Sequence, residues 1–199
     1  MRFETSRLEA FSDGVFAIAI TLLVLEISVP PAAFNDLWRG IGDQWPSYLA
    51  YVTSFLTIGG LWLAHHGIFR RMRFADITVL RMNIFLLMVV AFLPFPTTLV
   101  AQGLRTTSGE RPAVLFYGAT LFVVTATISA IGRYVAARGE LTREGTQAEL
   151  RALAARTTPS LAFYGLVLLF AVLAPEVAAF GFLAVAAVAV VRPPVAEAP

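Results

Sequence analysis

The sequence predicts an all-α integral membrane protein with six transmembrane helices. Of its 199 residues, 58% are hydrophobic and 14% are charged, against about 45–50% and about 25% in soluble domains. Apolar segments recur along the chain at the length of about 20 residues that crosses a bilayer. Arginines gather at the ends of these segments, as they do in multi-pass membrane proteins.

The chain is expected to form one membrane domain, residues 1–199. Two prolines, Pro30 and Pro31, end its first span, and Arg70 and Arg71 follow the second. The six expected spans cover about residues 8–28, 46–69, 80–102, 112–136, 159–173 and 177–191.

Prolines also shape the later spans. Pro94 and Pro96 interrupt the third span, where they kink the helix and free backbone carbonyl groups. The fifth and sixth spans are short and are separated by little more than Pro175, which predicts a tight helical hairpin. Before them, the polar segment 139–156 is expected to be an amphipathic cytoplasmic connector that leads into the fifth span.

Arginine placement predicts the orientation in the membrane. One side is expected to hold Arg39, Arg105 and Arg111. The other side is expected to hold Arg2, Arg7, Arg70, Arg71, Arg73, Arg81, Arg133, Arg138, Arg143, Arg151, Arg156 and Arg192. Because the more positive side faces the cytoplasm, both termini are expected to be cytoplasmic, in a bacterial plasma membrane.

The composition excludes or disfavours several kinds of binding site. The sequence has no cysteine, which excludes disulfides and cysteine-ligated metals. Its histidines, His65 and His66, are adjacent and diverge by about 100° on a helix, so a metal site is not expected. The arginines are explained by topology, which gives no reason to expect nucleic acid as a partner.

The first span carries a costly charge beside an apolar stripe. Asp13 lies near its start, and a charge costs about 2.5–3.5 kcal/mol at the middle of a bilayer. At about 100° per residue, Asp13 points about 140° away from Ile18. Within about 60° of Ile18 the helix carries a stripe that is apolar apart from one threonine. This stripe consists of Phe11, Gly14, Ile18, Thr21, Leu22 and Leu25.

Two interpretations of the stripe follow from periodicity. It faces lipid or neighbouring helices while Asp13 lines a polar cavity, or it lines an axial pore while Asp13 braces the surrounding helices. In either case one of His65 and His66 is expected to turn inward and to hydrogen-bond Asp13. A polar layer at this depth would also include Arg7 and either Arg81 or Asn83.

The residues Arg7, Phe11, Ser12 and Asp13 match the pattern RxxxFSD. A long apolar helix, a second span with histidines and a third span with prolines follow. In these features the chain resembles the prokaryotic branch of the transmembrane protein 175 family, whose animal members are lysosomal and endosomal potassium channels. The resemblance implies one six-span unit per chain and a homotetramer whose first spans line a central pore. It also implies no carbonyl selectivity-filter loop, and the sequence contains no TVGYG segment.

The resemblance also implies roles for individual residues. Ile18, five positions after the motif aspartate, would form the pore constriction, and Thr21 would contribute to ion selectivity. Leu22 and Leu25 would continue the lining. The RxxxFSD motif itself would be structural, tying the first span to the second and third.

The function expected from these features is that of a potassium-favouring cation leak channel with a hydrophobic constriction, and not of an enzyme. Its partners would be further copies of itself, the bilayer and monovalent cations, with K⁺ as the permeating ion and no cofactor. One alternative is a proton-coupled or small-solute transporter that uses Asp13 and a histidine as a proton relay. Another is a membrane enzyme or assembly factor with a site near the histidines and Pro94–Thr98.

Overall fold

The computed structural model describes residues 3–191 of the chain, with the backbone alone described at 156–158. Helices dominate this range, and extended pairing in it is limited to two isolated bridges. The prediction of an all-helical membrane protein is therefore confirmed. Arg2 and Arg192, which contributed to the predicted orientation, lie outside the described residues, and so does the side chain of Arg156.

Five helical segments of the described chain are long and apolar enough to cross a membrane, and α8 is a shorter apolar helix. The elements in order are α1 (Thr5–Leu22), the 3₁₀ turns η1 (Leu23–Glu26) and η2 (Pro31–Asp36), α2 (Leu37–Gly42), α3 (Trp45–Arg70), α4 (Ile77–Phe92), α5 (Pro94–Gly103), α6 (Glu110–Ala137), the 3₁₀ turn η3 (Gly139–Leu141), α7 (Gln147–Phe170) and α8 (Pro175–Val191).

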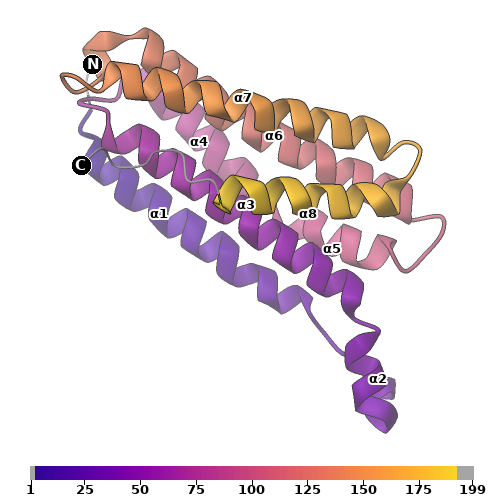
Figure 1. The fold of residues 1–199 in the computed structure, drawn as a ribbon. Helices are drawn as coiled ribbons and strands as arrows, with labels where there is room; N and C mark the ends of the chain where they lie inside the picture. Colours follow the sequence, from indigo (N-terminus) through magenta and orange to yellow (C-terminus); the bar gives the residue numbers. More distant parts are fainter. Residues whose placement is uncertain (1–2, 192–199) are drawn as a thin grey trace.

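The long helices lie side by side in one bundle (Figure 1). Helix α1 lies at one edge, where it packs against α3 and α4, and α7 lies at the opposite edge, where it packs against α6 and α8. The short helix α2 projects from the end of the bundle at which α1 finishes (Figure 1). Large side chains fill the interior, and Phe16, Ile58, Leu86, Leu121 and Ile128 are each at most 1% exposed. Helix α1 therefore contacts the core along one side.

The third span is divided by its first proline. Helix α4 ends at Phe92 and α5 begins at Pro94, which has no backbone N–H to donate. The turn tightens here, because the Leu93 N–H donates to the Val90 carbonyl at 3.1 Å. Beyond the break, a buried cluster of hydroxyls joins α5 to two other helices: Ser54 Oγ lies 2.7 Å from Thr97 Oγ1 and 2.9 Å from the Tyr117 hydroxyl.

Helix α7 begins at Gln147, inside the segment that the sequence suggested as a connector. Its first turns are polar on one side only. Leu150 and Leu153 on the other side are at most 1% exposed, so they extend the apolar face of the fifth span toward the loop. Helical structure continues through Pro159, and the connector and the span form one element.

A candidate pore-lining face and its polar support

The apolar stripe of α1 is largely uncovered in the single chain. Ile18 is 61% exposed, Leu22 is 42% exposed and Leu25 is 72% exposed. Thr21 between them is also exposed, and its hydroxyl donates to the Ile18 carbonyl at 2.9 Å. That bond uses the hydroxyl proton and leaves the oxygen lone pairs of Thr21 facing outward as acceptors. The stripe thus combines bulky aliphatic groups with one potential oxygen ligand, the Thr21 hydroxyl.

The opposite side of α1 belongs to the core. Phe16 and Ala19 are each 1% exposed, and Leu23 is fully buried. A helix with one buried side and one uncovered side is stable in a membrane protein when lipid, another subunit or water-filled space meets the uncovered side. The stripe therefore belongs to the uncovered side of α1, which also includes Ala17 and can contact lipid, another subunit or water.

The outer end of the stripe departs from α-helical geometry. Helix α1 ends at Leu22 and continues as the 3₁₀ turn η1 (Leu23–Glu26), in which successive side chains are about 120° apart. A wheel drawn at 100° per residue does not apply to Leu25 for this reason. Leu25 nevertheless remains the most exposed of the large stripe residues.

Three buried polar side chains connect α1 to its neighbours. Ser12 Oγ on α1 donates to the Leu8 carbonyl at 2.8 Å and accepts from Asn83 Nδ2 on α4 at 3.0 Å. Asn83 Oδ1 in turn lies 2.9 Å from His65 Nε2 on α3. Each of the three is at most 1% exposed. We call Ser12, Asn83 and His65 the polar bridge, because they join α1, α3 and α4 through hydrogen bonds.

Aromatic rings enclose the histidine of the polar bridge. The His65 ring is stacked on Phe69 with centroids 4.0 Å apart, and Phe16 of α1 lies 5.5 Å away in a tilted arrangement. These contacts fix the direction of the imidazole, so that its Nε2 meets Asn83.

The partner of Asp13 corrects one expectation from the sequence. Asp13 was expected to bond a histidine, but its Oδ1 accepts from the Trp62 indole N–H at 2.8 Å. Trp62 also stacks on His66, one helical turn later, with centroids 5.7 Å apart. Trp62 was missed as a site residue, although its spacing of four residues from His66 places both on the same side of α3. The bond to the buried histidine instead comes from Asn83.

The remaining motif residues are arranged differently from the bridge. Phe11 is 62% exposed on the stripe. Arg7 and Arg81 are exposed, and in the described part of the chain they take no part in the hydrogen bonds of the polar bridge. The sequence suggested a single layer of polar side chains. The structure instead has two separate groups, the buried polar bridge and the exposed pair of Asp13 and Trp62.

A second set of contacts holds the start of α1. The backbone of Phe3 pairs with that of Ala75 through two hydrogen bonds of 2.8 and 3.0 Å. Asp76, the next residue, caps α4 by accepting from the Val79 N–H at 2.9 Å, and it accepts from the Tyr134 hydroxyl of α6 at 2.8 Å. The N-terminal segment at Phe3, the α3–α4 loop and α6 are thus joined at one point.

The carboxylate of Asp76 is stabilised in its charged form. Burial raises its pKa, but the Val79 N–H, the Tyr134 hydroxyl and the Arg138 guanidinium lower it by more, so that the pKa lies below its ordinary value. Arg138 lies 3.7 Å from Asp76 and stacks over the Tyr134 ring at 4.5 Å.

The described residues contain no group of three or more His, Asp or Glu side chains that could hold a metal ion. The α1 face itself offers aliphatic side chains and the hydroxyl oxygen of Thr21.

Known proteins are similar to this chain in sequence and in fold. The family model described as "Endosomal/lysosomal potassium channel TMEM175" matches residues 7–94, which contain α1, the polar bridge and α4. A potassium channel of Streptomyces collinus is 43% identical over 139 residues, which are 69% of this chain and 68% of that protein. An endosomal/lysosomal proton channel TMEM175 of Danio rerio is 36% identical over 139 residues, and the match spans 27% of its length.

The fold is shared over almost the whole chain. The crystal structure of a lysosomal potassium-selective channel TMEM175 homolog from Chamaesiphon minutus superposes with a TM-score of 0.86 at 32% identity, covering 95% of this chain and 97% of that one. The fold is thus that of a multi-span helical membrane channel. The chain belongs to the TMEM175 family. This membership confirms the predictions of a passive channel and of a protein that is not an enzyme.

Proposed function

We propose that this protein is a potassium-favouring cation leak channel of a bacterial plasma membrane, with both termini cytoplasmic. Four copies would place their α1 helices around a central axis, with Ile18 of each forming a hydrophobic constriction. In a chain that belongs to a family of potassium channels, one observation carries the proposal: the stripe from Phe11 to Leu25 is uncovered in the single chain, while Phe16 and Ala19 of the same helix are buried in the core. A bulky aliphatic ring excludes water when narrow, and it lets cations pass when it widens.

Thr21 would act one turn beyond the constriction. Its hydroxyl proton is committed to the Ile18 carbonyl, so its oxygen is free to replace water around a partly dehydrated cation. Hydroxyl oxygens are hard ligands suited to K⁺ and Na⁺, and selectivity between the two would depend on the diameter that Ile18 sets.

The polar bridge and the Trp62 contact would keep α1 in place around the axis. Neither is suited to a proton relay. Asn83 stands between Ser12 and His65 and has no titratable proton to pass on, and the indole N–H that faces Asp13 does not exchange protons with a carboxylate at neutral pH. The transporter alternative therefore finds less support than the channel.

The test is an Ile18→Asn substitution in protein reconstituted into liposomes. Replacing an aliphatic ring by amides should wet the constriction, raise K⁺ flux several-fold and reduce the preference for K⁺ over Na⁺. The matched control is Ile84→Asn, since Ile84 on α4 is an isoleucine with the same 61% exposure but does not lie on α1. Equal fluxes in the Ile18→Asn variant and the unsubstituted protein would remove Ile18 from the conduction path.

A further inference from the structure

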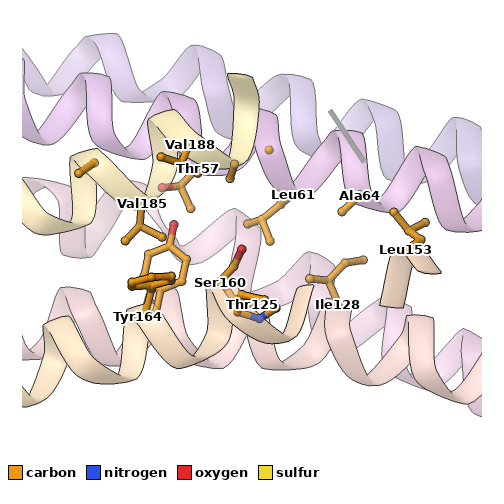
Figure 2. A pocket seen from close by; sticks show the side chains of 15 residues that line it. Thr57, Leu61, Ala64, Thr125, Ile128, Leu153, Ser160, Tyr164, Val185 and Val188 are labelled. Carbon is orange, nitrogen blue, oxygen red and sulfur yellow. The ribbon is translucent and has the colours of Figure 1, made fainter. Parts of the chain in front are cut away.

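Helix α6 has a hollow on each of two sides. Figure 2 shows Thr125 and Ile128 of α6 in the wall of a cavity that this helix shares with α3, α7 and α8. Ala126 and Ala130, about 100° and 140° around α6 from Thr125, line a separate open groove of about 500 Å³ against α4. The described residues that line the cavity include no charged side chain, whereas Arg81 of α4 lines the groove. The groove therefore carries a charge that can select its occupant.

The groove between α4 and α6 opens away from α1. Arg81 and Phe85 lie about 160° around α4 from Asn83. Asn83 belongs to the polar bridge and meets α1 and α3. In the groove wall, Phe85 is 44% exposed and Val123 of α6 is 40% exposed. The groove is thus open to the surroundings of the single chain, on a side of α4 that does not face the proposed conduction path.

Two arginines stand at one end of this groove. The start of α4 lies beside the end of α6, because Asp76 accepts from the Tyr134 hydroxyl there. Arg81 in the second turn of α4 and Arg133 near the end of α6 are therefore at the same end of the bundle. Arg133 follows Ala126 by seven residues, so it lies within about 20° of Ala126 around the helix and continues the line of the groove. Both arginines are exposed, and in the described part of the chain neither forms an ion pair.

The helices of the groove supply no carboxylate to these arginines. Helix α4 contains no acidic residue, and the acidic residue of α6, Glu110, is at its opposite end. Asp76, which precedes α4, is already engaged by the Val79 N–H, the Tyr134 hydroxyl and Arg138. The end of the groove thus has two positive charges for which α4 and α6 provide no counter-charge.

The length of the groove corresponds to half of a bilayer. From Phe122 at its deep end to Arg133, α6 advances about 16 Å at about 1.5 Å per residue. Half of a hydrocarbon core about 30 Å thick is about 15 Å. Between these ends the wall is apolar apart from Thr127, whose hydroxyl is satisfied by the Val123 carbonyl at 2.8 Å. An apolar chain that starts at the arginines and follows the groove would therefore end near the middle of the membrane.

We propose that the groove between α4 and α6 binds an anionic phospholipid. Its phosphate lies between Arg81 and Arg133, and one acyl chain lies along Ala130 and Ala126 toward Phe122. Guanidinium groups bind phosphate oxygens through paired, charge-assisted hydrogen bonds, and basic pockets between membrane helices suit anionic headgroups. A zwitterionic headgroup would bring its own cation to the two arginines, so an anionic headgroup is favoured. The proposal does not depend on the conduction path, because lipid binding can be measured without any flux.

The experiment is photolabelling of the full chain in phosphatidylcholine liposomes. The probe is a trace of phosphatidylglycerol with a photoactivatable diazirine in its acyl chain, and the comparison is phosphatidylcholine with the same labelled chain. The phosphatidylglycerol probe should label the groove residues of α4 and α6 at least fivefold more than the phosphatidylcholine probe does. Excess unlabelled phosphatidylglycerol should compete, whereas glycerophosphoglycerol, the same headgroup without acyl chains, should not.

Three outcomes would overturn the proposal. Equal labelling by the two probes would mean that the groove meets bulk lipid without selecting it. Competition by glycerophosphoglycerol would mean that the arginines bind a soluble phosphate. Absence of label on α4 and α6, with label on other helices, would mean that a second copy of the chain covers the groove.

Substitutions of the arginines test the charge. Arg81→Gln and Arg133→Gln should each reduce the preference for the phosphatidylglycerol probe severalfold, and Arg81→Lys should retain part of it because the charge remains. The matched control is Arg111→Gln, the same change at an exposed position at the opposite end of α6, which should leave the labelling unchanged. An unchanged preference in both Arg81→Gln and Arg133→Gln would contradict the assignment of the phosphate.

A substitution in the floor of the groove tests the position of the acyl chain. Ala126→Phe should fill the floor and reduce labelling severalfold although both arginines remain. Ala119→Phe is its control, since Ala119 is exposed on α6 two turns before Ala126 and does not line the groove. If Ala126→Phe is labelled as strongly as the unsubstituted protein, the acyl chain does not lie in the groove.

Discussion

Asn83 has both ends of its side-chain amide committed to groups on other helices. Its Nδ2 donates to Ser12 and its Oδ1 meets His65, so that one buried residue of α4 fixes the distance from α1 to α3. Inside a membrane no water is available to replace a lost hydrogen-bond partner. Asn83 is therefore expected to contribute more to the stability of the bundle than the size of its side chain suggests.

We expect Asn83→Leu to destabilise the protein in detergent by about 1–3 kcal/mol, because it leaves the buried His65 nitrogen without a partner. Thermal unfolding of Asn83→Leu, His65→Leu and the double variant would measure the coupling. The two changes should be non-additive, as for residues in direct contact. Asn83→Leu combined with Thr53→Val, whose hydroxyl bonds only within α3, should be additive; additivity in both pairs would contradict the polar bridge.

For Asp13 the structure favours the role of a hydrogen-bond acceptor over that of a charge carrier. Asp13→Asn keeps an oxygen for the Trp62 indole, so assembly and K⁺ flux at pH 5.5 and pH 7.5 should match those of the unsubstituted protein. Asp13→Ala should lower thermal stability, as should Trp62→Phe. An intact Asp13→Asn particle that has lost a pH-dependent flux would instead restore the proton-relay alternative.

Sequence reasoning identified the residues of the polar bridge and Asp13, but it missed Trp62 and the pairing of these side chains. The motif directed attention to Ser12, Asp13 and both histidines, and helical periodicity placed Asp13 off the stripe. The donor that bonds Asp13 is determined by the rotation of α3 about its axis relative to α1. The pattern of residues within one helix gives no information on this rotation. Nothing in the sequence links Trp62 to Asp13, which lies 49 residues earlier in the chain.

At the level of elements, the α3–α4 loop holds the N-terminal segment that precedes α1. Phe3 pairs with Ala75, and Asp76 beside it caps α4 and reaches Tyr134 and Arg138 of α6. Because the folded protein lowers the pKa of Asp76, the charged carboxylate stabilises the fold at pH values above the ordinary pKa of about 3.9. This stabilisation is lost as the pH falls through the lowered pKa.

Asp76→Asn should therefore lower the thermal stability at pH 7 and remove part of its decline between pH 5 and pH 3. Asparagine still caps a helix, so the change keeps the cap while it removes the charge and the second acceptor oxygen that meets Tyr134 and Arg138. Asp36→Asn is the matched control, because Asp36 also caps a helix, α2, but does so at an exposed position. Parallel pH profiles for the unsubstituted protein and Asp76→Asn would exclude a contribution from the Asp76 charge.

The observed bounds of the helices show which helix ends can be predicted from composition and which cannot. For the second and fourth spans, apolar content and flanking arginines suggested 46–69 and 112–136, close to the observed α3 and α6. For the fifth span they suggested 159–173, whereas α7 begins at Gln147. A helix end outside the hydrocarbon needs only a narrow apolar side for packing, here Leu150 and Leu153, and average hydropathy over a window conceals it.

At the scale of the whole molecule, the question is which surfaces meet further copies of the chain. The stripe and the outer side of α7 are both apolar and both uncovered. Burial in one chain does not distinguish a surface on the symmetry axis from one that faces lipid. The sequence suggested the axis only through the resemblance to a known family, since no pattern within one subunit records its symmetry.

The absence of cysteine makes this question directly testable, because one substitution introduces the only thiol. We expect Ile18→Cys and Leu25→Cys, placed separately, to form disulfide-linked dimers of subunits on mild oxidation, since residues that line a fourfold axis approach their own copies. Leu173→Cys is the control: Leu173 is 79% exposed at the end of α7 farthest along the chain from α1, and it should remain monomeric. Denaturing gels without reductant would report the products. Efficient cross-linking of Leu173→Cys together with monomeric Ile18→Cys would move the symmetry axis to the opposite edge of the bundle.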